Sequence, residues 1–244
     1  MKKAVILLVV ALFANVSVSQ NSTESGALIG AALASSQSPE EGVKTINAIV
    51  NNEEFHQISV VSQTIIWLDR CKIYLKIYKD PNLSTKYPDA LDKANESLKC
   101  VNKLHDNNPY NSDIKTLLGD FYCEEDNVLY DGDKAIRYYK EVVEIHPRNL
   151  EANKKVFNLY LALSNKKIVL ANEITGFSKR EIELQSALFQ ESKDYLRDGL
   201  PYGEMIFDYQ PDIEICQVLM QIYDRLGMLD KMKAMHEKLI ELQQ

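Results

Sequence analysis

Apolar residues recur at helical spacing through almost the whole chain after Gly26, and almost no segment alternates as a β-strand would. The pattern is clearest near the end. After Pro211, one stripe consists of Ile215, Cys216, Leu219, Met220, Tyr223 and Leu226. After Gly227, a second stripe consists of Leu229, Met232, His236, Leu239 and Ile240. Because so short a break separates them, each amphipathic helix must bury its stripe against the other, which predicts an antiparallel helix pair.

The same pairing can be read earlier, where turn signals separate the helical segments. The expected pairs are 60–79 with 88–104, 113–123 with 133–145, and 150–163 with 178–196. A smaller hairpin of segments 27–34 and 40–50 precedes them. A break or kink is expected at Gly199-Leu200-Pro201, because an interior proline removes a helical hydrogen bond. We therefore expect an all-α fold of eight to ten helices with no sheet.

Particular residue types recur from pair to pair. The first pair carries Trp67, Cys71 and Tyr74, followed by Ser97, Val101, Leu104 and Pro109. The next carries Leu118-Gly119, Tyr122, Ala135, Tyr139, Val142, Pro147 and Asn149, and the last carries Leu219, Tyr223, Gly227, Met232, His236 and Leu239. This spacing resembles the tetratricopeptide repeat (TPR) family, whose helix pairs stack into a solenoid.

The third unit departs from the family pattern. Val156, Phe157 and Tyr160 fit a first helix, but no second helix follows at the usual distance. Two interpretations remain open for the chain that follows. Its second helix either comes after a long insertion, with Gly199, Gly203, Ile206 and Pro211, or belongs to a separate unit that starts near Ser178.

The resemblance implies a right-handed superhelix of antiparallel helix pairs whose first helices line a groove for a protein or peptide. By position, the groove residues are Leu68, Lys72, Lys76, Thr116, Asp120, Lys154, Asn158, Gln217 and Gln221. Lys72 and Lys76 form an i, i+4 pair suited to an acidic group such as a peptide carboxylate. The alternative is an ordinary solvated helix face. Asp120 argues against a uniformly basic groove.

The N-terminus has the layout of an export signal. Lys2 and Lys3 precede an apolar run over residues 4–14, and small residues place a cut before Gln20. A retained anchor is the alternative, but the run is shorter than the about 20 residues that span a bilayer. We expect a signal peptide at 1–19, a capping hairpin at 20–56 and a TPR-like domain at 57–244, with no transmembrane segment after cleavage.

Charge and cysteine content narrow the possible partners. The formal net charge is −7, removal of Lys2 and Lys3 makes it more negative, and no basic stripe is present, so nucleic acid is not an expected partner. Cys71, Cys100, Cys123 and Cys216 show no metal-binding spacing. The expected helix geometry offsets Cys71 from Cys100 beyond disulfide range, which favours buried thiols.

Motifs for catalysis are scarce, and we expect neither an enzyme nor a cofactor. The four histidines are scattered singly, and His236 is expected to pack in the interior of the last helix pair. The acidic segment around Glu124 and Asp126 lacks the spacing of a known cation loop, so a solvated connection is favoured over a metal site. The tyrosines at helical spacing are expected to pack between helices rather than to stack on a ligand.

These features together predict an exported scaffold, periplasmic or secreted, that binds a protein or peptide. The alternative is a structural subunit of an envelope or secretion assembly. The export signal, the cut before Gln20 and the repeat style also resemble envelope proteins of Bacteroidota.

Overall fold

The computed structural model describes residues 20–124 and 126–243, so the expected signal peptide lies outside the described residues. These residues contain eleven α-helices, one 3-10 helix and no β-strand. The all-α expectation is confirmed. There is one helix more than the eight to ten expected, because the turn after residue 79 forms a short helix of its own. The chain divides into two compact units, the first ending at Tyr130 and the second beginning at Asp131.

The first unit contains six α-helices and the 3-10 helix. They are α2 (Gln20–Ser36), α3 (Pro39–Val50), η1 (Glu53–Gln57), α4 (Val60–Lys79), α5 (Pro81–Lys86), α6 (Ala90–Asn107) and α7 (Ser112–Cys123). Helix α4 is central, because α2, α3, α5, α6 and α7 all pack against it. The two helices of the expected N-terminal hairpin are present as α2 and α3, which pack against each other.

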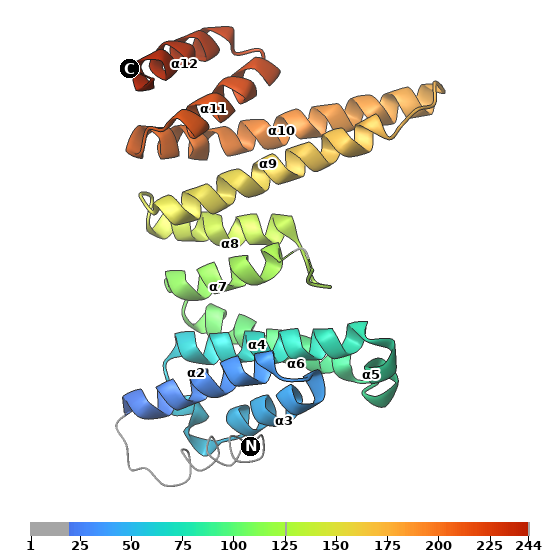
Figure 1. Cartoon of the computed structure of the whole chain (residues 1–244), viewed down its shortest axis with the longest axis vertical. Helices are drawn as coiled ribbons and strands as arrows, with labels where there is room; N and C mark the ends of the chain where they lie inside the picture. Colours follow the sequence, from blue (N-terminus) through green and yellow to red (C-terminus); the bar gives the residue numbers. More distant parts are fainter. Residues whose placement is uncertain (1–19, 125, 244) are drawn as a thin grey trace. The chain divides into compact units, whose positions relative to one another are not determined.

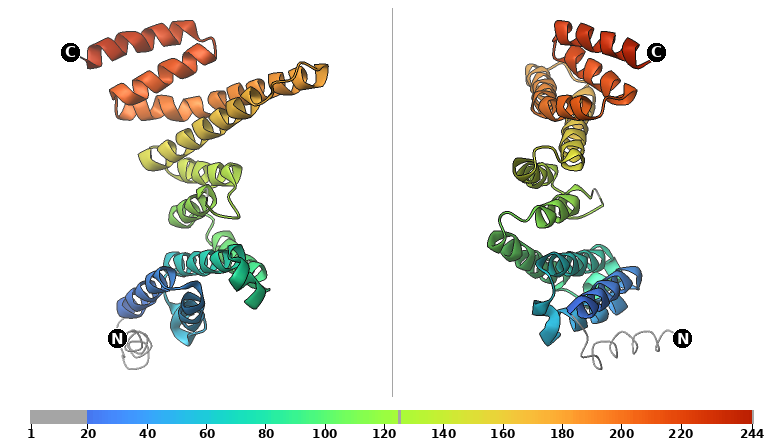
Figure 2. Two further views of the ribbon diagram at one scale, coloured as in Figure 1. Left: turned by 45° about the vertical axis from the view of Figure 1, so that its right-hand side comes forward. Right: turned by 90° about the vertical axis from the view of Figure 1, so that its left-hand side faces the viewer.

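The second unit contains α8 (Gly132–Ile145), α9 (Leu150–Asn172), α10 (Lys179–Tyr209), α11 (Ile213–Arg225) and α12 (Leu229–Leu242). Each helix packs against the next one along the chain. Figure 1 shows α9 and α10 running antiparallel along most of their length, and the left view in Figure 2 agrees. The expected pairing of the last two helices is confirmed, since α11 packs on α12.

Short polar side chains begin most of these helices. The side chains of Ser38, Ser59, Asn149 and Asp212 each accept a hydrogen bond from a backbone N–H of the following helix's first turn. Such caps satisfy donors that the helix itself leaves unpaired. Ser178 forms a complete capping box with Glu181 at the start of α10. Local sequence therefore determines where these helices begin.

Helix α10 corrects the first part of the expected break or kink. It runs for 31 residues with Pro201 inside it, so Gly199-Leu200-Pro201 does not end the helix. Gly199 and Gly203 allow close packing on α9. A Cβ atom on Gly199 would lie 2.8 Å from Tyr160 Cβ, and one on Gly203 would lie 2.5 Å from Phe157 Cε2. This packing stabilises the helix beyond the proline. The late part of α10 contacts Phe157 and Tyr160, and α10 begins at Lys179, directly after Ser178, so features of both interpretations are present.

Polar contacts join helices within each unit. In the first, the buried Arg70 on α4 donates to Asn47 Oδ1 on α3 (2.9 Å) and to Ser97 Oγ on α6 (2.6 Å). In the second, Glu204 on α10 accepts from Tyr223 on α11 and from Lys231 on α12, each at 2.7 Å. These bonds define how the helices around them are oriented.

The expectations for the tyrosines and for His236 had different outcomes. The expected interhelical packing is confirmed for the buried tyrosines, whereas Tyr78 is exposed; the buried ones are Tyr74, Tyr122, Tyr138, Tyr139, Tyr160 and Tyr223. The expectation for His236 is wrong. His236 is exposed, and its neighbour Met235 is the buried side chain of α12. Met232 and Leu239 of the expected stripe pack against the core with Met235, whereas Leu229, His236 and Ile240 are exposed.

Candidate functional site

Helix α4 supplies three of the groove residues expected from the sequence. Leu68 corrects that expectation, because it is only 5% exposed and belongs to the core of the first unit. Helices pack around α4 on several sides, so positions beside its main packing stripe are covered as well. Lys72 is half-buried and Lys76 is exposed. Of the three, only the two lysines present polar atoms that another molecule can reach.

The other expected groove residues form three i, i+4 pairs. Thr116 and Asp120 on α7 are both half-buried, and the Thr116 hydroxyl donates to the Ser112 carbonyl at 2.9 Å. The pairs of the second unit are Lys154 with Asn158 on α9, and Gln217 with Gln221 on α11. Lys154 is half-buried and the other three are exposed. Each pair faces one side of its own helix.

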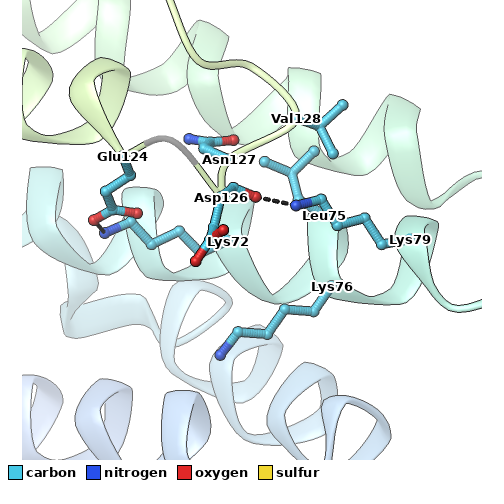
Figure 3. A pocket seen from close by; sticks show the side chains of 8 residues that line it. All are labelled: Lys72, Leu75, Lys76, Lys79, Glu124, Asp126, Asn127 and Val128. Atoms are coloured by element: carbon cyan, nitrogen blue, oxygen red, sulfur yellow. Dashed lines mark hydrogen bonds and ion pairs between the residues drawn. The ribbon is translucent and has the colours of Figure 1, made fainter. Parts of the chain in front are cut away.

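Lys72 and Lys76 line a pocket of about 230 Å³ between α4 and the loop that follows α7. Helix α4 contributes Lys72, Leu75, Lys76 and Lys79, and the loop contributes Glu124, Asp126, Asn127 and Val128. Figure 3 shows these side chains. Lys72, Lys76 and Lys79 stand at i, i+4 and i+7, which places three ammonium groups along one side of α4. We call this surface the lysine face of α4.

The loop contacts the lysine face at Lys72 and at Lys79, the two ends of that face. Lys72 Nζ lies 2.5 Å from Glu124 Oε1, and Lys79 Nζ donates to the backbone carbonyl of Asp126. Lys76 extends away from the loop in Figure 3, and its ammonium group is 3.5 Å from the Ser35 carbonyl of α2. Two of the three lysine ammonium groups are therefore already paired, Lys72 with a carboxylate and Lys79 with a main-chain carbonyl oxygen.

Asn127 gives the loop its shape. Its side-chain amide donates to the Phe121 carbonyl at 3.0 Å, and its Oδ1 accepts from the Leu129 N–H at 3.0 Å. Its backbone N–H donates to the Glu124 carbonyl at 2.9 Å. These bonds join the loop to itself and to the end of α7, so the turn does not depend on α4 for its local structure.

Asp69 lies one turn before Lys72, on the same side of α4, and was not singled out from the sequence. Burial raises the pKa of Asp69 to about 6, although the charges of Lys72 and Lys76 and the Ser35 hydroxyl act to lower it. The nearby carboxylate of Glu124 adds to the rise. The proton on Asp69 thus responds to the same charges that line the pocket.

The chemistry available at the lysine face is anion recognition. Ammonium groups donate charge-assisted hydrogen bonds to carboxylate oxygens, and Leu75 and Val128 add an apolar wall. The sequence singled out Lys72, Lys76 and the acidic loop separately. It did not place the loop on α4. Lys79 could have been found as the next lysine on the same side of the helix.

Two acidic residues that follow α7 pair with other groups of the protein. Glu124 pairs with Lys72, and Asp131, at the start of the second unit, caps α8 by accepting from the Lys134 N–H at 3.0 Å. Within residues 20–124 and 126–243, no group of three or more His, Cys, Asp or Glu side chains is placed to hold a metal ion.

The four cysteines are thiols. Cys71 and Cys216 are buried as expected, whereas Cys100 and Cys123 are half-buried. Burial raises the pKa of Cys71 to about 12, so its thiol carries no nucleophilic charge near neutral pH.

The described residues define an all-helical protein of neighbouring helix pairs with a lysine-lined pocket in its first unit. Among these residues, no helix combines the length and the apolar character needed to cross a bilayer. The chain matches no protein-family model, and a search of curated proteins found no match.

Proposed function

We propose that this chain is a TPR-like helical solenoid that acts as a non-catalytic, protein-binding scaffold of the cell envelope. On this proposal it is exported with the help of residues 1–19 and works in the periplasm or outside the cell. The observation that carries the proposal is the pocket beside α4. Lys72 and Lys76, which the TPR resemblance assigns to the groove, both line that pocket.

The charge of the pocket suggests which part of a partner binds there. A carboxylate side chain or a C-terminal carboxylate fits the lysine face, because two or three ammonium groups can share one anion. Lys72 has a side chain that is 34% exposed, so its amine reaches solvent while its stem packs on the protein. A partner with an acidic segment therefore finds donors that are already positioned.

A pull-down with matched variants tests the proposal. The chain from Gln20 onward is immobilised and exposed to envelope extract, as wild type and as Lys72→Ala/Lys76→Ala. The control is Lys99→Ala/Lys103→Ala, since these lysines form an exposed i, i+4 pair on α6 of the same unit. We expect a specific protein to be retained by wild type and control and to be reduced about tenfold or more by the pocket variant. Equal recovery by all three, with all of them folded, would contradict the proposal.

A structural subunit of an envelope assembly is the second candidate, and the hairpin of α9 and α10 favours it. Large apolar side chains are exposed where these helices approach their connecting turn, namely Val169, Leu170, Phe177, Ile182, Leu184 and Phe189. Phe177 is 91% exposed. Clustered apolar exposure of this kind marks contact surfaces. Light scattering distinguishes the candidates, because a permanent subunit should self-associate until Phe177 and Ile182 are changed to Ser, whereas a groove binder should be monomeric throughout.

A further inference from the structure

The loop after α7 contacts the lysine face of α4 as a bound peptide would. Glu124 presents a carboxylate to Lys72, and the main chain of Asp126 presents a carbonyl oxygen to Lys79. Val128 lines the same pocket as Leu75. One short turn thus supplies an acidic group, a main-chain acceptor and an aliphatic side chain to the lysine face.

This loop is held on α4 by contacts that are easily exchanged. The side chains of Lys72 and Glu124 are 34% and 46% exposed, so solvent screens their ion pair. Val128 is 41% exposed. The hydrogen bonds that shape the turn run from Asn127 to Phe121, Glu124 and Leu129, and they survive if the turn leaves α4. Moving the loop therefore costs its polar contacts with α4 and little of its own structure.

We propose that Glu124, Asp126 and Val128 of the loop after α7 are an internal competitor for the binding site of a partner protein. The partner presents an acidic turn with an aliphatic residue four positions after its carboxylate, as Val128 follows Glu124. This inference rests on the proposed function and names the partner's chemistry and its regulation. Because the loop is tethered beside the site, its effective concentration is about millimolar, so a partner must bind well enough to displace it.

The loop's own sequence supplies the probe. A fluorescein-labelled peptide with the sequence of residues 123–129, with Ser in place of Cys123, is titrated with the protein and followed by fluorescence anisotropy. The proteins are wild type, Glu124→Gln and Glu96→Gln. Glu96 is the matched control, because it is also exposed and pairs with a lysine, Lys93, at 3.1 Å on α6.

If the loop competes, Glu124→Gln binds the peptide about two- to fivefold more tightly than wild type, since the exposed ion pair that holds the loop is lost. Glu96→Gln binds like wild type. Val128→Ser, which removes the aliphatic anchor of the loop, also binds more tightly. A peptide with Gln in place of its first Glu, or with Ser in place of its Val, binds more weakly to every protein.

The outcomes separate this inference from the proposed function. Equal binding to wild type, Glu124→Gln and Val128→Ser, with binding lost in Lys72→Ala/Lys76→Ala, overturns the competitor role and leaves the lysine face as the partner site. Absence of binding to all of these proteins overturns both the acidic-segment partner and the competitor role. The pull-down of the previous section then decides separately whether the chain is a scaffold.

Discussion

Gly203 in α10 lies against the ring of Phe157 in α9. A Cβ atom at Gly203 would be 2.5 Å from Phe157 Cε2 and 3.0 Å from Leu219 Cδ2 on α11. Three helices of the second unit therefore meet where one residue has no side chain. Because Phe157 and Leu219 are themselves buried, neither can move aside without disturbing the core.

Gly203→Ala should lower the free energy of unfolding by about 1–3 kcal/mol, because the added methyl group overpacks this crossing. Urea denaturation measures the change. Ser186→Ala, at an exposed position of the same helix, is the control and should stay within about 0.5 kcal/mol of wild type. A Gly203→Ala protein as stable as wild type would mean that α9 and α10 are farther apart than described.

Pro201→Ala should raise stability by about 1–2 kcal/mol. Pro201 is exposed and lies inside α10, where a proline is less favourable than Ala by about 3 kcal/mol, part of which is returned by its stiffness in the unfolded chain. Thermal unfolding tests this. Pro211→Ala, which changes a proline outside the helices, should bring no such gain, and a loss of stability in Pro201→Ala would indicate that the proline is required.

Asp69→Asn should change how stability depends on pH. The pKa of Asp69 is raised to about 6 in the folded chain from an ordinary 3.8, so the folded state holds this proton more tightly than the unfolded state. The stabilisation from the proton is complete below pH 3.8 and is lost as the pH rises through about 6.

The Asp69→Asn variant has a neutral side chain at every pH, so it does not lose stability when the wild-type Asp69 loses its proton. The free energy of unfolding of Asp69→Asn, taken relative to wild type, should therefore rise by about 1–2 kcal/mol from pH 3.5 to pH 7.5. This value is reduced for partial solvent screening. Denaturant unfolding at both pH values provides the comparison, with Asp92→Asn on the exposed side of α6 as the control. A constant difference at both pH values would show that Asp69 is not desolvated.

Arg70→Ala should destabilise the first unit by about 3 kcal/mol, since it leaves Asn47 and Ser97 without their charged donor. Arg70→Lys should recover only part of this, because one ammonium group cannot reproduce the planar guanidinium between the rings of Trp67 and Tyr74. Chemical denaturation measures both variants. Arg137→Ala is the control, as Arg137 also stacks on a tyrosine but is exposed, and its cost should be under about 1 kcal/mol.

Helices with clear local signals were predictable from the sequence. Helix α4 has the bounds expected for it, Val60 to Lys79, and α11 begins after Asp212 and ends before Gly227 as expected. A single apolar stripe and a capping residue are local properties, and they act before any tertiary contact forms. For the same reason Gly227, with a φ of 72°, reliably marks a helix end.

Positions that depend on neighbouring helices were not predictable in this way. Leu68 is buried because several helices pack around α4, and the buried side chain of α12 is Met235 rather than His236. The continuation of α10 through Pro201 depends on Phe157 and Tyr160, which lie some forty residues earlier in the chain. Likewise, the pairing of Lys72 with Glu124 joins residues 52 positions apart, and no local pattern indicates it.

The amino-acid sequence by itself determined that this protein is made of helices, where most of them begin, and which lysines stand together on α4, because helix periodicity and capping act over a few residues. Only the tertiary structure decided which helix faces are covered and that an acidic loop lies on those lysines. Burial and charge pairing arise when distant segments meet, and the free energy of those contacts is absent from any short stretch of the chain.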